Sequence, residues 1–375
     1  MKKNLIFILL PALTACHPVQ EVPEVFNVRD YGAVGDGLAD CTAAIQEAID
    51  SCTVRGGRVL VPEGTYLSGT LYLKDGVDLH LEKGATLLGK EDPEAYDSFI
   101  PRRDLSMYDS GGNSANANNT SDRRWMKAFI QGNGIRNVSI TGEGLIDGRH
   151  VFDSLGEEGM RGPHTILIGE AENFRMEGVS VTRAANYAFL GYALERAVFK
   201  DLHITEGWDG IHIRGGKDVE ITGCTFETGD DCIAGGYWEG MRIHDCGINS
   251  SCNGIRMIMP SDGVEVFDSR FFGPGNYPHR TSGEARRNNM LFGVCLEPGA
   301  WGEAPGTARN IVLHDLVFKH LSSPVSTSVR KGSKAEDLTL ENITATGITG
   351  TFSPVVSWND EGFTSVTVRN LSMSR

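Results

Sequence analysis

The sequence lacks the excess of positive charge that a nucleic-acid-binding protein needs. Its 49 aspartates and glutamates outnumber 35 lysines and arginines, which gives a formal net charge of -14. Because binding to nucleic acid depends on a basic surface that neutralises phosphates, this balance argues against such a partner. Proline is also scarce, at 14 residues, whereas glycine is abundant, at 46. That combination is typical of short strands joined by tight turns.

Beyond its first residues the chain has no apolar run long enough to cross a membrane. A short apolar run at 5–10 follows two lysines, as in an export signal, and the Leu-Thr-Ala-Cys sequence ending at Cys16 resembles a bacterial lipobox. We therefore expect a lipoprotein signal peptide at 1–16, a lipid on the sulfur of Cys16, and a tether at 17–24. The protein would then be anchored in the bacterial cell envelope by this lipid alone, or secreted. The alternative is a plain signal peptide with an incidental cysteine.

Cysteines are too few and too irregularly spaced for a disulfide framework. Of the 8 in the chain, an odd number remains after Cys16. Cys41 and Cys52 flank one predicted helix and would lie about 16 Å apart at 1.5 Å per residue, too far to bridge. No C-x-x-C pair or histidine cluster predicts a metal site. We expect buried free thiols, no metal and no cofactor.

One amphipathic helix is predicted at 41–52, with Asp40 as its N-cap. After it, a six-residue phrase of alternating polar and apolar residues recurs, beginning at Asn137, Asn173, Ala197, Asp218, Gly240, Gly263, Asn310 and Asp337. From the second to the sixth of these it returns every 21 to 24 residues, the length of one coil of a parallel β-helix. We therefore expect an all-β chain in which residues 25–375 form one single-stranded right-handed parallel β-helix, capped at its first coil by the helix.

Longer segments interrupt the repeat. The gap between the phrases at Gly263 and Asn310 holds either a coil plus a long loop or two irregular coils. Residues 91–125, rich in Ser, Asn and Asp, form another excursion. Long loops on a rigid solenoid commonly form the walls of a binding site, so we expect 91–125 and 273–309 to do so.

A column of acidic residues follows from the repeat. Successive coils stack about 4.8 Å apart, so residues one period apart lie above one another. Asp209, Asp231 and Asn253 follow at intervals of 22 residues, with Asp230 beside the second of them and Asn186 one coil earlier. Carboxylates one or two coils apart fall in the range used for glycoside hydrolysis, one as acid and one as base. A purely structural ladder of turn residues is the alternative, although stacked acids repel one another.

Cationic and aromatic residues near this column are candidates for substrate binding. His212, Arg214 and Arg256 are suited to binding sugar hydroxyls or an anionic group. Asn186 and Asn253 of the column are also expected to bind substrate. Aromatic rings suit the apolar faces of sugars, and those in the same coils are Trp208, Tyr237, Trp238, Tyr277 and Trp301.

Several motifs resemble those of glycoside hydrolase family 28, the polygalacturonase group, over nearly the whole mature length. The opening FNVRDYGAVGDGLADCTAAIQEAID and the later GEGLIDG look like those of pectin-acting β-helix proteins. The family's Asn-Thr-Asp-Gly, Gly-Asp-Asp and Gly-His-Gly motifs are matched by Gly207-Trp208-Asp209-Gly210, Gly229-Asp230-Asp231 and Cys252-Asn253-Gly254.

This resemblance implies an inverting hydrolase acting on a pectin-like or other acidic polysaccharide or oligosaccharide, with Asp230 as general acid and Asp209 and Asp231 activating water. Two departures stand out. The family's histidine is Asn253, and its Arg-x-Lys pair has no counterpart at 293–297. Either other arginines replace the lost cations, or the reacting sugar is neutral; the candidate arginines are Arg256, Arg280, Arg286 and Arg287.

Three functions are therefore open for a chain that we expect to be monomeric. The first is glycoside hydrolysis. The second is a polysaccharide lyase or uronate epimerase, which needs a basic residue near the substrate carboxylate and would use His212, Arg214 or Arg256. The third is a non-catalytic glycan-binding β-helix.

Overall fold

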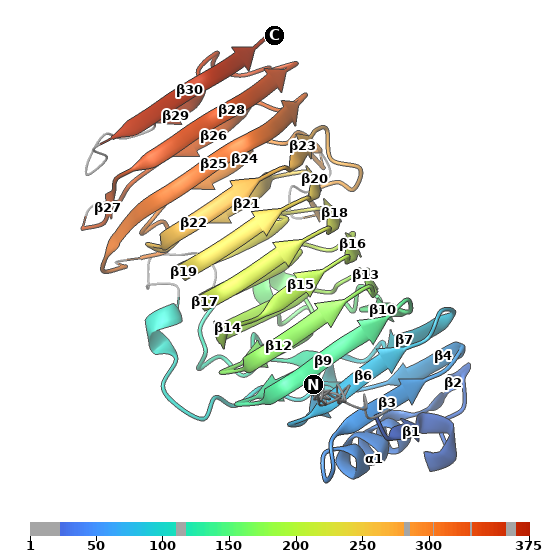
Figure 1. Ribbon diagram of the computed structural model, residues 1–375. Coiled ribbons are helices and arrows are strands. Elements are labelled where there is room, and N and C mark those ends of the chain that lie inside the picture. Colours follow the sequence, from blue (N-terminus) through green and yellow to red (C-terminus); the bar gives the residue numbers. More distant parts are fainter. Residues whose placement is uncertain (1–22, 110–117, 281–285, 303, 331, 358–364) are drawn as a thin grey trace, which may run out of the picture.

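The computed structural model describes residues 23–109, 118–280, 286–302, 304–330, 332–357 and 365–375. Almost all of its elements are strands, and each coil pairs in parallel with the next from one end of the solenoid to the other (Figure 1). The expected all-β, right-handed parallel β-helix is confirmed. Residues 1–16, with Cys16, and most of the expected tether at 17–24 lie outside the described residues.

Three parallel sheets run along the solenoid. The first contains the repeated phrase and consists of β1 (Val25–Asn27), β3 (Gly57–Val61), β6 (Val77–Leu81), β9 (Arg136–Gly142), β12 (Glu172–Glu177), β15 (Val198–Lys200), β22 (Asp262–Phe267) and parts of the long strands β17 (Ile211–Thr222), β19 (Ile233–His244), β25 (Thr307–Lys319), β28 (Leu338–Thr346) and β30 (Val366–Met373). The second consists of β2 (Asp36–Asp40), β4 (Gly64–Ser68), β7 (Ala85–Gly89), β10 (Leu145–Asp147), β13 (Ser180–Thr182), β16 (His203–Thr205), β18 (Thr225–Thr228), β20 (Gly247–Ser250), β23 (Arg270–Phe272) and the later parts of β25, β28 and β30.

The third sheet positions the candidate site. It consists of β5 (Leu71–Leu73), β8 (Ala128–Asn133), β11 (His164–Gly169), β14 (Phe189–Glu195), the first parts of β17 and β19, β21 (Asn253–Met257), β24 (Phe292–Leu296), β26 (Ser323–Thr327) and β29 (Val355–Ser357). A short strand, β27 (Lys334–Ala335), pairs with the start of β25.

The repeated phrase reflects both packing and turn geometry. Its apolar positions, such as Val264 and Val266 in β22, are buried in the core, while the residues between them are partly exposed. Its first polar residue has a left-handed backbone, with φ of 53° at Asn137 and 58° at Asn173, a conformation that Asn and Asp tolerate best. The side-chain amide of Asn173 donates to Oδ1 of Asn137 at 2.9 Å. The structural ladder considered above therefore exists, but at a different corner from the acids.

The N-terminal helix α1 (Thr42–Cys52) lies at the first coils of the solenoid (Figure 1). It buries Ile45, Ala48, Ile49 and Cys52, the face that the sequence predicts. The N-cap is Cys41 and not Asp40, because the helix begins one residue later than expected. The Asp40 carboxylate still accepts a hydrogen bond from the Thr42 amide at 3.0 Å. No helix among the described residues has the length and apolarity that a membrane crossing requires.

The seven cysteines of the described chain are all buried and free, as expected. Cys41 and Cys52 belong to the core beside α1. The fold is therefore held by packing and backbone hydrogen bonds in this part of the chain, without covalent cross-links.

Four long excursions border the third sheet. Residues 90–127 lie between β7 and β8 and include η2 (Pro93–Ala95) and η3 (Ser106–Tyr108), and residues 148–163 lie between β10 and β11 and include η4 (Glu157–Gly159). Residues 273–291 and 297–306 flank β24. Because β22 pairs directly with β25, the long gap in the repeat is one coil whose extra residues form two loops. The first of the two alternatives for this gap is therefore correct. A fourth 3-10 helix, η1 (Val28–Tyr31), follows β1.

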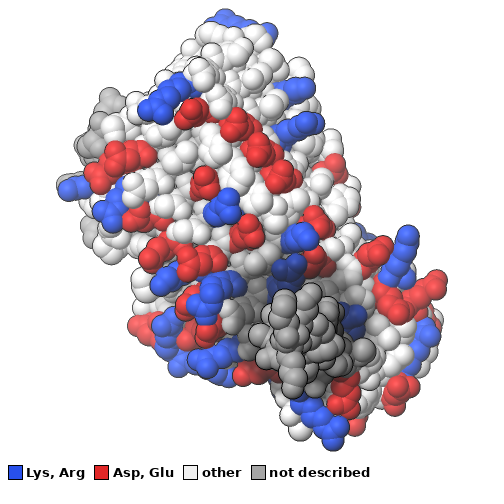
Figure 2. Space-filling model, viewed as in Figure 1, with Lys and Arg blue, Asp and Glu red and all other residues white. Residues whose placement is uncertain are grey.

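The first sheet carries a mixed pattern of charge. Figure 2 shows acidic and basic side chains interspersed on this face, without a continuous basic area on it. Neighbouring coils pair across it, as where Arg242 contacts Glu265 at 3.1 Å and Lys200 contacts Glu177 at 3.1 Å. Such pairs contribute little stability individually because solvent screens them.

Candidate active site

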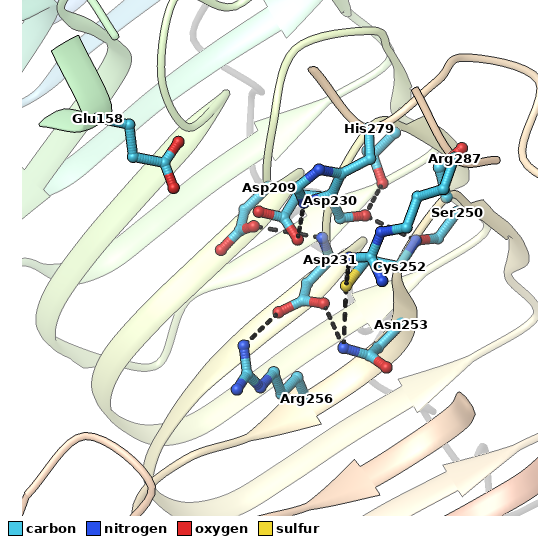
Figure 3. A network of polar contacts seen from close by, with 12 residues as sticks. Glu158, Asp209, Asp230, Asp231, Ser250, Cys252, Asn253, Arg256, His279 and Arg287 are labelled. Carbon is cyan, nitrogen blue, oxygen red and sulfur yellow. Dashed lines mark hydrogen bonds and ion pairs between the residues drawn. The ribbon is translucent and has the colours of Figure 1, made fainter. Parts of the chain in front are cut away.

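The acidic column forms where successive coils enter the third sheet. Asp209 precedes β17, Asp230 and Asp231 precede β19, and Asn253 begins β21. The register of these strands places Asp209, Asp231 and Asn253 above one another, as the repeat predicts. The Asp231 amide donates to Oδ1 of Asp209 at 3.2 Å, and Nδ2 of Asn253 donates to Oδ1 of Asp231 at 2.8 Å (Figure 3).

The three carboxyl groups lie about as close together as the coil spacing suggests. Asp209, Asp230 and Asp231 each offer one oxygen, and these three atoms all lie within 4.8 Å of one another. Carboxyl groups of two-residue inverting enzymes are usually about 6.5–9.5 Å apart, so spacing alone does not predict inversion here. Two oxygens at this separation can both accept from one water at about 2.8 Å. The cluster is therefore able to hold a water molecule between carboxyl groups.

Burial and mutual repulsion favour a proton on two of these acids. Asp209 and Asp231 are each only 3% exposed. Burial, reinforced by the charge of Asp230, raises the pKa of Asp231 to about 6. Burial also raises the pKa of Asp209 well above its usual value, with the charges of both neighbouring aspartates adding to the effect. Near neutral pH the pair can therefore hold or release a proton.

The pKa of Asp230 shifts in the opposite direction because His279 and Arg161 lie beside its carboxylate. Burial favours its neutral form, but His279 and Arg161 outweigh burial and hold its pKa below the usual value. Nε2 of His279 lies 3.5 Å from Oδ1 of Asp230, and Nη2 of Arg161 lies 3.6 Å from Oδ2. The Asp230 side chain is 16% exposed, against 4% for each of Asp209 and Asp231. Asp230 is therefore an ionised carboxylate in contact with the side chains of Arg161 and His279.

The acids face a cavity of about 200 Å³ that is walled by the long loops. Its lining residues are Asn118, Glu157, Glu158, Arg161, Tyr187, Asp209, Asp230, Asp231, Cys252, Arg256, His279, Arg287 and Trp301. The expected loops at 91–125 and 273–309 both contribute. Residues 148–163 contribute a third wall that the sequence did not predict, because nothing in their composition marks this short segment as a loop over the site.

Asn253 and Arg256 lie beside the acids, as expected for binding residues. Nη1 of Arg256 is 3.7 Å from Oδ2 of Asp231. The same guanidinium donates two hydrogen bonds to Glu297, at 3.0 and 2.9 Å. Arg256 therefore already has two carboxylate partners at the edge of the cavity.

His212 and Arg214 do not contact the cavity, which corrects their predicted role in substrate binding. His212 is fully buried, its Nδ1 is 2.7 Å from Oδ2 of Asp209, and its Nε2 accepts from Nε of Arg214 at 3.2 Å. Nδ1 therefore carries the proton and donates to Asp209. Burial, then the charge of Arg214, lowers the pKa of His212 well below its usual value, so the ring is neutral. It stacks on Tyr187 at 4.7 Å and on Trp301 at 5.7 Å between ring centroids.

The predicted tryptophan contacts with substrate are also corrected. Trp238 is 1% exposed and its Nε1 donates to the Ile213 carbonyl at 2.8 Å, so it is a core residue. Trp208 is 2% exposed, and its ring contacts the guanidinium groups of Arg161 and Arg280 at 4.8 and 4.6 Å. Neither ring is available to a sugar.

Asn186 is one residue out of the predicted column. The pairing of Phe189 with Ile211 places Tyr187, not Asn186, beside Asp209. Tyr187 lines the cavity, whereas Asn186 is 2% exposed and does not. Counting 22 residues back from Asp209, the interval between the other members of the column, would have identified Tyr187. No sequence signal identified Arg161 or His279, because both come from non-repeating loops.

Comparison with known proteins places the chain in a family. The family model described as "Rhamnogalacturonase A/epimerase, pectate lyase-like" matches residues 25–256. The chain is similar to an exo-poly-alpha-D-galacturonosidase of Dickeya chrysanthemi, with 27% identity over 252 residues. The match covers 56% of this chain and 42% of that relative, so the chain spans less than half of the relative's length.

Solved structures share the fold with this chain. A hyperthermoactive exopolygalacturonase from Thermotoga maritima matches with a TM-score of 0.68 and 17% identity, over 94% of this chain and 93% of that one. PfbA, a surface adhesin of Streptococcus pneumoniae, matches with a TM-score of 0.61 and 17% identity, over 93% of this chain and 83% of that one. Because an enzyme and an adhesin both share the fold, function must be argued from the site.

We predict that Asp231→Asn stabilises the protein at alkaline pH but not in acid. Because the pKa of Asp231 is raised to about 6 in the folded chain from the usual 3.8, ionisation weakens the folded state as pH rises through this window. The wild type should lose on the order of 3 kcal/mol of unfolding free energy at pH 8 relative to pH 4 through this group. Chemical denaturation of both proteins at the two pH values measures this difference. The control is Asp218→Asn at an exposed corner of the first sheet, and an equal effect of Asp231→Asn at both pH values would contradict the prediction.

Proposed function

The chain belongs to the pectate lyase-like rhamnogalacturonase A/epimerase family, as a divergent relative of glycoside hydrolase family 28, and we propose that it hydrolyses a glycosidic bond in a pectin-type polysaccharide or oligosaccharide. The main support is the placement of Asp209, Asp230 and Asp231 around one cavity, with an oxygen of each within 4.8 Å of the others. These are the three acids that the family resemblance assigns to catalysis.

In the proposed reaction, Asp209 and Asp231 hold the attacking water and Asp230 acts at the leaving oxygen. Asp230 is the most exposed of the three and contacts His279, so this pair can share the proton that the leaving oxygen receives. As the water attacks the anomeric carbon, its proton passes to Asp231, the glycosidic bond breaks, and the configuration inverts. His279, from the loop before β24, then takes the place of the histidine that the family has at Asn253.

The size of the cavity supports action at a chain end. Its volume of about 200 Å³ is below the roughly 300–1,000 Å³ of pockets for drug-sized ligands. Loops at 90–127, 148–163 and 297–306 all contribute side chains to its walls, namely Asn118, Glu157 and Trp301. Such a space suits one sugar ring, as an exo-acting or short-oligosaccharide glycosidase requires.

The lyase or epimerase alternative has less support from the site. It needs a basic group that is free to act on the substrate, but His212 and Arg214 are fully buried and bonded to Asp209 and to loop carbonyls. Arg256 lines the cavity but is paired with Asp231 and Glu297. A purely glycan-binding role does not explain the buried acidic cluster. The cluster lowers the stability of the folded chain when it is ionised, and such a cost is typical of functional sites.

Replacing either Asp209 or Asp230 by Asn should reduce kcat/KM on the true substrate at least about 100-fold, because each variant removes a proton-transfer group. A library of pectic oligosaccharides with mass detection of products provides the assay. The matched control is Asp218→Asn, at a turn of the first sheet where Asn fits the left-handed backbone, φ 53°. Full activity of both site variants would rule out the proposed chemistry.

Activity should rise with pH through an acid limb near pH 6. Water activation needs an ionised Asp231, whose pKa of about 6 makes activity rise through this pH. Measuring kcat/KM between pH 4 and 9 tests this expectation, and maximal activity already at pH 4 would contradict the role of Asp231.

We also propose that the protein is tethered to the cell envelope by a lipid on Cys16. The support is the Leu-Thr-Ala-Cys sequence alone, because Cys16 lies outside the described residues. In a bacterial host, Cys16→Ala should move the protein from the membrane fraction to the soluble fraction and abolish labelling by a palmitate analogue. Gln20→Ala, in the tether, is the control. A wild type that takes up no label would refute the anchor.

A further inference from the structure

One buried carboxyl group in the cavity has no role in the chemistry described above. Glu157 lies in η4 of the 148–163 loop, and its side chain is 6% exposed. Among the described residues, neither of its oxygens has a hydrogen bond of good geometry, and the Asn186 amide interacts with it only weakly. The nearest cation is Nη1 of Arg161, at 3.7 Å. A buried acceptor without a donor costs free energy, so a ligand that donates hydrogen bonds would be stabilised here.

A second unpaired acceptor lines the same cavity. Asn118 is 1% exposed, and its Oδ1 has no hydrogen-bond partner in the part of the chain that is described. Trp301 adds an aromatic ring to the lining. A ring face together with acceptors suits a sugar, whose hydroxyls donate hydrogen bonds and whose C–H face is apolar.

Of the three arginines that line the cavity, two are paired with carboxylates, and the third, Arg287, donates to Sγ of Cys252 at 3.1 Å. Arg161 contacts Glu157, Glu158 at 3.1 Å and Asp230. Arg256 contacts Glu297 and Asp231. A carboxylate on the substrate would have to compete with these partners for the same guanidinium groups.

Acidic side chains outnumber arginines in the lining of the cavity. The lining contains Glu157, Glu158, Asp209, Asp230 and Asp231, against Arg161, Arg256 and Arg287. Figure 3 shows Glu158 on a part of the chain separate from the aspartates. In a poorly solvated site, like charges repel strongly and exclude the wrong ligand.

We infer that the sugar held in this cavity is neutral, with its hydroxyls donating to Glu157 and Asn118, and that the acidic lining excludes a terminal uronate. This inference rests on the proposed hydrolysis at the same cavity. Acidic sugars of the polysaccharide would then lie outside the cavity, beyond the bond that is cleaved.

Paired substrates separate this inference from the proposed function. Each pectic oligosaccharide ending in rhamnose, galactose or arabinose is matched with one of equal length that ends in galacturonate, and the released monosaccharide is identified by mass. We expect release of a neutral sugar, at least roughly tenfold faster than of galacturonate. Equal or faster release of galacturonate would overturn the inference and leave hydrolysis standing.

If neither set of oligosaccharides is hydrolysed, the proposed function is refuted. Binding measurements then test the inference about the sugar in the cavity. Calorimetric titration of the wild type with the same pairs should still show tighter binding of a neutral-ended member. Equal or tighter binding of the galacturonate-ended members would overturn it.

Glu157→Gln tests the residue itself. The variant keeps the shape of the side chain but loses the charged acceptor, so kcat/KM for the neutral-ended substrate should fall about 10–100-fold. Discrimination against galacturonate ends should weaken at the same time, a change that a purely structural role would not produce. The matched control is Glu177→Gln, on the first sheet. An unchanged rate and an unchanged ratio between the paired substrates would contradict a specificity role for Glu157.

Discussion

Parallel backbone hydrogen bonds between successive coils hold the acids of this protein in place. Beside the column, the Ala188 amide donates to the Asp209 carbonyl at 2.9 Å, and the Gly210 amide donates to the Asp231 carbonyl at 2.9 Å. In the same way, the Cys232 amide donates to the Asn253 carbonyl at 3.2 Å. Because each coil is bonded to its neighbours, the carboxyl groups cannot move apart when they ionise. The fold thus maintains an arrangement that electrostatics alone would disperse.

A buried network of hydrogen bonds fixes the orientation of the Asp209 carboxylate. His212 donates to Asp209, and Arg214 donates to His212 and to the carbonyls of Tyr108 and Asn118. Because Arg214 holds the imidazole in one neutral tautomer, Asp209 receives a hydrogen bond in a fixed direction. This network also joins the third sheet to the 90–127 loop. The position of the cavity wall and the orientation of Asp209 therefore both depend on Arg214 and His212.

The positions of residues could be predicted from the sequence where the coil period applies, but not in the loops between coils. The solenoid, α1 and the column of Asp209 and Asp231 follow from the regular spacing, since one period places residues above one another. Asn186 was misplaced by one residue because it lies 23 residues before Asp209, whereas the coil that pairs Phe189 with Ile211 has a period of 22 residues. The predicted contacts of Trp238 failed because alternation along β19 turns its ring into the core. Glu157 and Arg161 belong to a loop with no repeat, so only the folded chain brings them to the acids.

The attachment of the 148–163 loop allows the wall of the cavity to change while the coils that carry the acids stay in place. Both ends of the loop are fixed by neighbouring strands, β10 and β11, whose register does not depend on how many residues lie between them. Insertions, deletions or substitutions in this loop can therefore change the shape of the cavity without shifting any coil. Across evolution, the specificity of such a protein is free to change quickly while its three acids stay in place.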